Sequence, residues 1–480
     1  MNKKKPNILI IMPDEMRADC LSLEKHPVLK TPNIDSIGQG GMHFTSGYST
    51  CPSCIAARRS MLTGLYPASN GVVGYKEGVA ITMPTVTECL RDDGYATSIA
   101  GRYMHQSPPE EPYGFQKRVL GSTYIRDDAY AQYLNEKAPD LGGISGIGMD
   151  CNGREGRAWP VDDELHPTSW AIRQSQKIVG DADDDKPFFH VSSYYSPHSP
   201  LFPPKRHMDH FLSMELPATA IGEWETPPSP ESYENNISAP RVNLQGEELR
   251  QTQSGYFGLI RQIDEEIAAL LNDFKKKSES MGRPWVIVFT SDHGEMLGDH
   301  YLFRKCEPYD GSARIPFLIQ GSDDLNFNTG GACNSPVCLE DIMPTLLDLA
   351  QIKSPDNLDG QSLVPVLRGK TDAVRELLHA EHAPCYGEAQ AFHLLTDGNL
   401  KYIWRPADGT EQLFDLKKDP RELNNLAAGE SPEVESLIAP WRTLMVQQLK
   451  ERPEGFSDGD QLIAGRAYAH VLPSVEVNKS

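Results

Sequence analysis

Short apolar runs alternate with longer amphipathic segments along the first three quarters of the chain. Runs of this kind, each followed by polar residues, are typical of strands buried on both faces of a sheet; they occupy residues 7–12, 96–100, 188–194, 285–290 and 315–320. Residues 247–274 instead repeat apolar positions at helical spacing. This alternation predicts an α/β domain built around a central sheet.

Turn and cap signals add shorter helices. One is predicted at 31–40, where a proline starts it, and one within 51–64, after a loop. Two more are predicted at 83–93, before Gly94, and at 342–350. Residues 106–165 are rich in Gly, Pro, Asp and Tyr and show no regular period. We therefore expect long loops there, close to the functional site.

The pattern changes after about residue 370. Three antiparallel strands and a final helix, interrupted by Pro440, are predicted at 392–395, 400–404, 412–416 and 432–450. We therefore expect a large domain over 1–370 and a small subdomain of antiparallel sheet and helix over 371–480.

The charge of the chain limits its partners. It has 46 basic and 67 acidic residues, a net charge of −21. Nucleic acid and anionic membranes are poor partners for such a surface, because both are themselves negative. A small anionic substrate remains compatible, since it responds to the local field of its pocket. No segment reaches the length of a transmembrane helix.

Two features indicate a cytoplasmic protein. The basic N-terminus is followed by an apolar run at 8–12 that is too short for a secretory signal, and no small-residue cleavage site follows. The nine cysteines show no spacing typical of a disulfide framework, which agrees with a reducing compartment. The sequence leaves the oligomeric state open between a monomer and a homo-oligomer.

Polar side chains follow several of the predicted strands. Asp14-Glu15 comes after the first strand, Asp292-His293 after the strand at 285–290, and His198 lies in the loop after 188–194. In open α/β sheets the ligand site lies outside the carboxyl ends of the strands, so these groups are candidates for one site. Carboxylates with an imidazole suit Ca²⁺, Mn²⁺ or Mg²⁺, and Zn²⁺ less well. Each pair alone is also compatible with a helix cap or a solvated turn.

Cys51-Pro52-Ser53-Cys54 is formally a C-x-x-C motif, which redox pairs and zinc sites also show. No second C-x-x-C completes a zinc ribbon, whereas a redox pair remains an alternative. The helix predicted from Ala56 places Arg58 one turn beyond Cys54 on the same face, while Arg59 points elsewhere. A nucleophile at a helix N-terminus with a cation one turn away is suited to an anionic group.

The stretch Cys54-Ile55-Ala56-Ala57-Arg58, with Leu62-Thr63-Gly64 after it, resembles the signature of type I, formylglycine-dependent sulfatases. Ala56 stands where many members have proline. Further matches follow the family's order: PNILIIMPDEMRAD, TSDHGEMLGDHYLFRK, GSARIPFLIQG, DIMPTLLDLA, LDGQSL and EQLFDLKKDPRELNNLA. The resemblance implies an α/β fold of the alkaline-phosphatase-like kind. This would be a large mixed sheet sandwiched by helices over 1–370, with the subdomain at 371–480 contributing to the substrate pocket.

The resemblance also implies roles for individual residues. Cys54 is converted to formylglycine (3-oxoalanine) by a formylglycine-generating or anaerobic sulfatase-maturating enzyme. A divalent metal, with calcium as the first choice and manganese, magnesium or zinc as alternatives, is held by Asp14, Glu15, Cys54, Asp292 and His293. Catalytic roles around the sulfate are implied for Arg58, Lys305, His198, Arg102 and His105.

Three positions differ from the usual pattern or lack a clear counterpart. Many members have Asp-Asp where this chain has Asp14-Glu15. The usual Gly-Lys-Trp-His appears here as Gly101-Arg102-Tyr103-Met104-His105, so an arginine fork replaces a lysine point charge. His379 and His382, at the start of the subdomain, are candidates for substrate binding, or else cap a strand.

The implied reaction is hydrolysis of a small anionic sulfate ester, either a sulfated carbohydrate or an aryl sulfate. One hydroxyl of the hydrated aldehyde attacks sulfur, Arg58 and Lys305 offset charge on the sulfate oxygens, and His198 or Lys305 protonates the departing alcohol. The second hydroxyl, once deprotonated, expels sulfate and restores the aldehyde.

Three alternatives remain. A phosphonate monoester or phosphodiester hydrolase would use the same formylglycine and metal, and its substrate carries the same single negative charge. Choline-sulfatase resembles this chain in Asp14, Cys54 and the sequence GSARIP, although the sequence shows no clear aromatic cage for a quaternary ammonium group. The alternative of another class is a non-catalytic binding protein with an unmodified Cys54.

Overall fold

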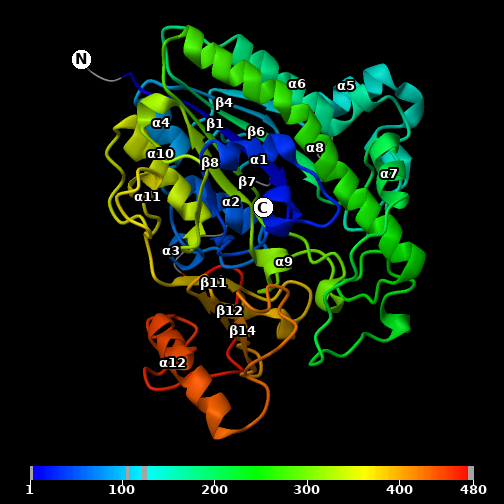
Figure 1. Cartoon of the computed structure of the whole chain (residues 1–480), viewed down its shortest axis with the longest axis vertical. Helices are drawn as coiled ribbons and strands as arrows, with labels where there is room; N and C mark the ends of the chain where they lie inside the picture. The colour runs from blue at the N-terminus through cyan, green and yellow to red at the C-terminus, as the bar shows by residue number, and fades with distance from the viewer. Residues whose placement is uncertain (1–3, 104–106, 122–126, 474–480) are drawn as a thin grey trace.

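The apolar runs form a large mixed sheet in a computed structural model that describes residues 4–103, 107–121 and 127–473 (Figure 1). Its strands lie in the order β5 (Lys117–Leu120), β4 (Ala96–Gly101), β6 (Phe188–Pro197), β1 (Asn7–Asp14), β7 (Trp285–Thr290), β8 (Phe317–Gly321), β2 (Met42–Phe44) and β9 (Gly331–Cys333). Neighbours from β5 to β7 run parallel, whereas β8 is antiparallel to both β7 and β2. The five predicted strands are confirmed, and the sheet is mixed as expected.

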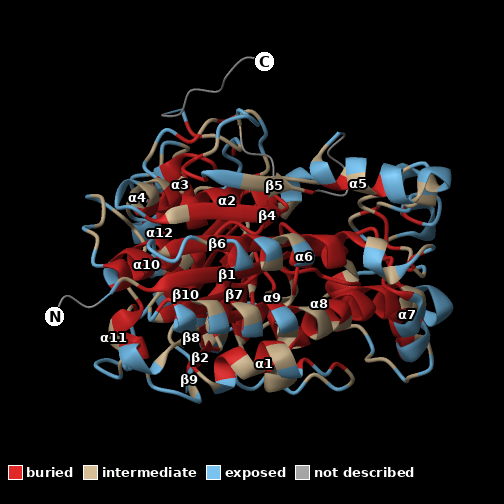
Figure 2. Ribbon diagram, turned by 90° about the horizontal axis from the view of Figure 1, so that it is seen from above, coloured by how far each residue is buried: buried red, intermediate tan, exposed pale blue. Residues whose placement is uncertain are grey.

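Helices cover both faces of this sheet. One layer contains α1 (Pro32–Gln39), α6 (Pro167–Gly180) and α8 (Gly246–Ser280), and the other contains α2 (Cys54–Thr63), α4 (Val86–Asp92), α10 (Ile342–Ala350) and α11 (Val364–Leu367). Figure 2 shows the buried strands between helices whose outer sides are exposed. Because alternate strand residues face opposite layers, burial on both faces explains the uninterrupted apolar runs.

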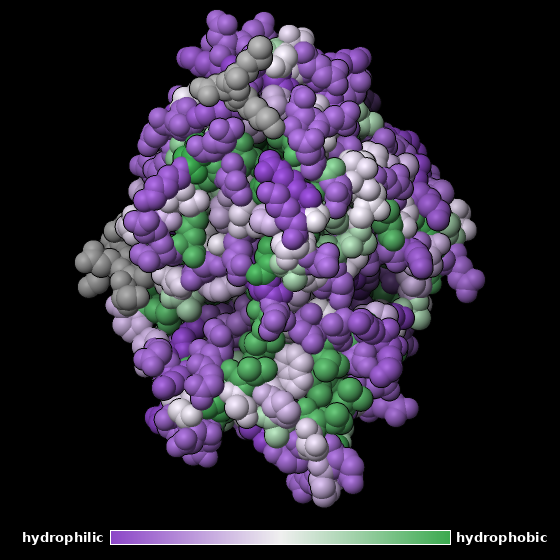
Figure 3. Space-filling model, turned by 60° about the vertical axis from the view of Figure 1, so that its left-hand side comes forward, coloured by the Kyte–Doolittle hydropathy of each residue, from purple (hydrophilic) through white to green (hydrophobic). Residues whose placement is uncertain are grey.

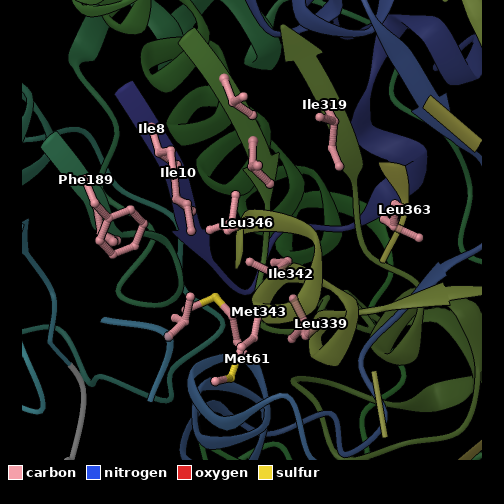
Figure 4. Packing of buried hydrophobic residues seen from close by; sticks show 14 of the residues in the cluster. Ile8, Ile10, Met61, Phe189, Ile319, Leu339, Ile342, Met343, Leu346 and Leu363 are labelled. Carbon is pink, nitrogen blue, oxygen red and sulfur yellow. The ribbon is translucent and has the colours of Figure 1, made fainter. Parts of the chain in front are cut away.

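Strand β1 shows how the two cores share the sheet. Ile8 and Ile10 pack into the core on the side of α2 and α10, which also contains Met61 of α2 and Leu346 of α10 (Figure 4). Leu9 and Ile11 point the opposite way and join the core formed with α6 and α8. All of these side chains are fully buried, so β1 is fixed from both sides.

Replacing Ile10 with alanine is expected to destabilise the protein by about 2–5 kcal/mol, because the removed atoms leave a cavity in a close-packed core. The shift of the urea unfolding midpoint, followed by tryptophan fluorescence, measures this effect. Ile237 is 39% exposed and provides the control, since Ile237→Ala should change stability by less than about 0.5 kcal/mol. Equal shifts for the two variants would contradict the packing described for β1.

The end of the chain forms a smaller antiparallel sheet below the first one (Figure 1). Its order is β11 (Leu378–His382), β12 (Phe392–Thr396), β13 (Leu400–Trp404) and β14 (Glu411–Asp415), and α12 (Pro432–Gln448) packs on it. The three strands predicted there are confirmed, and α12 continues through Pro440. Strand β11 was not predicted, because Glu381 and two histidines interrupt its apolar pattern.

Remaining elements connect these layers. They are α3 (Pro67–Asn70), α5 (Ala129–Lys137), α7 (Lys205–Leu212), α9 (Asp310–Ala313) and the paired strands β3 (Gly47–Tyr48) and β10 (Val337–Cys338). The prediction that 106–165 is all loop is therefore wrong for β5 and α5. Helix α5 buries Tyr130 and Leu134 beside Trp170, and two buried positions are too few to show a period.

The surface is largely polar. Figure 3 shows a hydrophilic face on which apolar residues gather toward the end of the molecule that carries the smaller sheet. Leu437 and Leu444 of α12 are among the exposed apolar side chains. Within the described ranges, no helix is both long enough and apolar enough to cross a membrane.

Candidate active site

The carboxyl end of β1 delivers two acidic side chains into the interior. Asp14 is the last residue of β1, and Glu15 follows in the left-handed region with φ of 69°. The Glu15 N–H donates to Asp292 Oδ1 at 3.1 Å, and the Tyr256 hydroxyl donates to the Glu15 carbonyl at 2.7 Å. Because β7 lies beside β1 and ends just before Asp292, adjacent strand ends bring the predicted acidic groups together.

Cys54 is the first residue of α2, and its thiol faces these groups. Its Sγ lies 3.7 Å from Asp14 Oδ1 and 3.1 Å from His293 Nε2. Burial, together with the charge of Asp14, raises the pKa of the thiol to about 12, so the unmodified sulfur is protonated and a poor nucleophile. No disulfide joins Cys51 and Cys54 in the described structure.

Arg58 lies one turn along α2 on the face of Cys54, where the helical spacing places it. Its Nε donates to Asp292 Oδ2 at 2.8 Å and its Nη2 to Asp14 Oδ2 at 3.1 Å, so one guanidinium joins two strand ends. Its Nη1 donates to Ser193 Oγ at 2.9 Å. Burial raises the pKa of Asp292, but Arg58 and then His293 outweigh it, and the net shift is well below the ordinary value.

Arg102 follows β4 and reaches the same carboxylate as Arg58. Its Nε lies 2.9 Å from Asp14 Oδ2, and its guanidinium stacks over the Tyr195 ring, 4.0 Å from the centroid. Asp14 thus holds two guanidinium groups through one oxygen and keeps Oδ1 toward Cys54. His105, which the sequence pairs with Arg102, lies outside the described residues.

Two further predicted residues lie close to the Glu15 side chain. His198 Nε2 lies 3.2 Å and Lys305 Nζ 3.4 Å from Glu15 Oε2. Burial raises the pKa of Glu15 to about 8, although Lys305 opposes the shift. The other oxygen, Oε1, is buried and has no hydrogen-bond partner among the described residues. An acceptor of this kind is suited to a ligand or an ion.

The donor atoms fit a divalent cation. His293 Nδ1 donates to the Gly294 carbonyl at 2.9 Å and His198 Nδ1 to the Ser199 carbonyl at 2.7 Å, so each ring turns its Nε2 toward the carboxylates. The two Nε2 atoms lie 3.2 and 3.9 Å from carboxylate oxygens, where each can offer a lone pair to a cation bound by those carboxylates. Two overlapping sets offer ligand atoms: Asp14, Cys54, Asp292 and His293, and Asp14, Glu15 and His198.

The two histidines predicted on the substrate side lie in different surroundings. His379 of β11 stacks on His393, and its Nε2 lies 3.1 Å from His393 Nδ1, within the smaller sheet. His382, at the end of β11, is buried; its Nδ1 donates to the Ala383 carbonyl. Burial lowers the pKa of His382 to about 4, and His293 is among the charges that contribute. The structure therefore buries His382 at the end of β11 and keeps His379 within the smaller sheet.

Three residues at the site were not predicted. Ser193 accepts from Arg58, Tyr195 lies under Arg102, and Glu295 contacts the Glu15 side chain while accepting from the Leu297 N–H at 2.8 Å. Ser193 and Tyr195 are two apart near the carboxyl end of β6, so their position at a strand end was a usable signal. Glu295 gave no such signal.

Known proteins resemble this chain over most of their length. The sulfatase family profile matches residues 6–352, and the profile for the C-terminal part of N-sulphoglucosamine sulphohydrolase matches residues 298–451. An arylsulfatase of Clostridium perfringens (strain 13 / Type A) is 35% identical over 96% of this chain and 98% of its own. A choline-sulfatase of Rhizobium meliloti (strain 1021) is 29% identical over 89% of this chain and 83% of its own.

The fold agrees with a solved structure. The phosphonate monoester hydrolase of Agrobacterium radiobacter covers 92% of this chain and 95% of its own, with a TM-score of 0.76 and 24% identity. That likeness confirms the alkaline-phosphatase-like fold expected from the sequence. The family profile spans more than half of this chain, and an arylsulfatase is 35% identical to it over nearly its whole length. The chain therefore belongs to the sulfatase family.

Proposed function

We propose that this sulfatase hydrolyses a small organic sulfate ester, a sulfated carbohydrate or an aryl sulfate, and releases inorganic sulfate. The position of Cys54 carries the proposal. Its Sγ lies at the N-terminus of α2, 3.7 Å from Asp14 and 3.1 Å from His293, with Arg58 one turn on. A helix N-terminus beside buried cations favours an anionic group, and the exclusion of water strengthens that attraction.

The described site residues include one more acidic than basic side chain. Four buried carboxyl groups (Asp14, Glu15, Asp292 and Glu295) face three buried cations (Arg58, Arg102 and Lys305). A divalent cation bound to this donor set would therefore leave the site with a net positive charge. A sulfate ester, which carries one negative charge, complements such a site.

Asp14, Glu15, Asp292 and His293 would hold the metal, with Ca²⁺ as the first choice and Mn²⁺, Mg²⁺ or Zn²⁺ as alternatives. When bound, the cation supplies positive charge at the sulfate oxygens and lowers the pKa of an oxygen nucleophile. Arg58 and Arg102 fix the orientation of Asp14 through its Oδ2, so that Oδ1 stays turned toward position 54.

Lys305 is assigned to protonate the departing alcohol. One of its three N–H groups points at Glu15 Oε2, which leaves donors for the ester oxygen. His198 is less suited to this step, because its Nδ1–H is engaged by the Ser199 carbonyl and its Nε2 therefore accepts. A positioned general acid contributes typically about 10²–10⁴-fold.

Conversion of Cys54 to formylglycine would replace the protonated thiol by an oxygen nucleophile. The partner in this step is a formylglycine-generating or anaerobic sulfatase-maturating enzyme. It must act before the chain closes around position 54, because the Cys54 side chain is only 1% exposed after folding. The spacing of the nine cysteines, which is not that of a disulfide framework, supports a reducing compartment such as the cytoplasm.

Adding Ca²⁺, Mn²⁺, Mg²⁺ or Zn²⁺ singly to chelator-treated protein is expected to raise the unfolding temperature. A ligand that binds only the folded state stabilises it by about 2.7 kcal/mol at 100 times its Kd. Differential scanning calorimetry measures the shift, and the ion with the largest shift is the preferred one. Asp292→Asn should remove most of it, whereas Glu340→Gln, at another buried carboxyl, should keep it. No shift with any of the four ions would contradict the metal site.

The structural likeness to a phosphonate monoester hydrolase favours a second candidate, hydrolysis of phosphonate monoesters or phosphodiesters. A comparison of kcat/KM for 4-nitrophenyl sulfate, 4-nitrophenyl phenylphosphonate and choline sulfate separates the candidates. We expect the aryl sulfate to exceed the phosphonate. An advantage of about tenfold or more for the phosphonate, equal to about 1.4 kcal/mol, would overturn the assignment. No turnover of any ester would instead favour a non-catalytic binding protein.

A further inference from the structure

A cavity of about 610 Å³ lies between the segment that carries Lys305 and the smaller sheet, and none of the steps above uses it. Its walls come from residues in 224–241, 300–309, 386–390 and 405–425. Its volume falls within the roughly 300–1,000 Å³ typical of small-molecule sites. The cavity is thus large enough for an organic group much larger than a sulfate.

One side chain links the wall of this cavity to the segment that carries Lys305. Gln390 lines the cavity, and its Nε2 donates to Glu307 Oε1 at 2.9 Å and to the Lys305 carbonyl at 3.5 Å. Its Oε1 accepts from the Tyr386 N–H at 2.7 Å. Tyr386 lines the cavity as well. The Gln390 side chain therefore forms hydrogen bonds both to the Lys305 backbone and to the cavity wall.

The wall chemistry argues against a cationic or purely aryl ligand. Arg304 covers the Tyr386 ring at 4.3 Å and Arg405 lies over the Tyr309 ring at 5.8 Å, so protein cations already occupy these aromatic faces. A quaternary ammonium group would find no free cage there. An aryl group would cover Glu307 and Arg405, which pair at 3.6 Å, without offering them a hydrogen bond.

We infer that the cavity binds the sugar part of a sulfated carbohydrate, with the sulfate group directed past Lys305 toward position 54. The inference rests on the proposed sulfatase function and narrows its substrate class. Sugar hydroxyls both donate and accept, which matches the carboxylate, guanidinium and amide groups of Glu307, Arg405 and Gln390. The partly exposed Trp224 at the cavity, stacked on His300 at 5.7 Å, offers an apolar surface for the C–H face of a sugar ring.

The test compares glucose 6-sulfate, galactose 6-sulfate and N-acetylglucosamine 6-sulfate with 4-nitrophenyl sulfate, using the matured, metal-loaded enzyme. Ala389→Trp fills the cavity from an exposed wall position and removes no existing contact of the site. It is expected to lower kcat/KM for the best sulfated sugar about tenfold, mainly through KM, and to leave 4-nitrophenyl sulfate within about threefold. Ala373→Trp is the matched control at an exposed alanine outside the cavity wall and should change neither value.

A second variant removes a large side chain from the cavity wall instead of adding one. Trp224→Ala should raise KM for the same sugar sulfate without changing turnover of 4-nitrophenyl sulfate. The inference would be overturned if the variants lost as much kcat/KM with 4-nitrophenyl sulfate as with the sugar sulfate. It would also be overturned if neither variant lost kcat/KM with either substrate. So would a wild-type enzyme that hydrolyses the aryl ester or choline sulfate but none of the three sugars, although that enzyme would still be a sulfatase. Failure with every sulfate ester would instead defeat the proposed function itself.

Discussion

Replacing Cys54 with alanine is expected to lower kcat/KM for 4-nitrophenyl sulfate by about 10⁴-fold or more, because loss of a covalent nucleophile leaves only binding and electrostatic stabilisation. The side chain is buried and small, so the fold should persist, and circular dichroism checks this. The rate measurement is sharpest with metal-loaded protein from a host that matures sulfatases. Mass spectrometry of the wild-type peptide should show the lower mass expected when sulfur is exchanged for an aldehyde oxygen.

Cys51 provides the control for this experiment. A redox pair needs both thiols of the C-x-x-C sequence, whereas formylglycine chemistry needs only the one at position 54. Cys51→Ala should therefore keep activity within about threefold of wild type, the range of an ordinary small perturbation away from the reacting atoms. Comparable losses in the two variants would favour the redox reading, and full activity of Cys54→Ala would remove Cys54 from the mechanism.

Local rules were sufficient to predict which segments carry the site. Asp14 and Asp292 follow buried strands, and the carboxyl ends of parallel strands meet at one edge of a sheet. Arg58 follows from helical spacing, because residues four apart share a face. Each of these positions depends on a few neighbouring residues, so the sequence alone contains the information.

Pairing between distant groups could not be predicted in this way. Glu15 shares an oxygen with His198 and Lys305, and Lys305 is 290 residues further along the chain. His379 meets His393 only because β11 and β12 pair in a particular register. Tyr195 lies under Arg102 because β4 and β6 are neighbours. These contacts are set by tertiary packing, and the spacing of residues in the sequence does not encode them.

The second large effect concerns Arg58. Replacing it with methionine is expected to destabilise the protein by about 3–5 kcal/mol, because Asp14 and Asp292 would lose the guanidinium that joins them and remain buried. The variant should also lose about 10²–10³-fold in kcat, since a preorganised positive group near the sulfate is removed. Urea unfolding and steady-state kinetics on the same preparation measure the two effects separately.

Arg59 is the matched control, since it is the next residue of α2 and equally buried. It donates to backbone carbonyls of Asn70, Val79 and Ala80, and burial lowers its pKa to about 10. Arg59→Met leaves neutral acceptors without a donor, which costs roughly 1–3 kcal/mol, and should keep kcat within about threefold. If both variants lost activity in proportion to stability, Arg58 would be only structural. A large loss of kcat in Arg58→Met alone, under conditions where both variants are folded, can arise only at the site, because the two side chains share one helix and differ in what they contact.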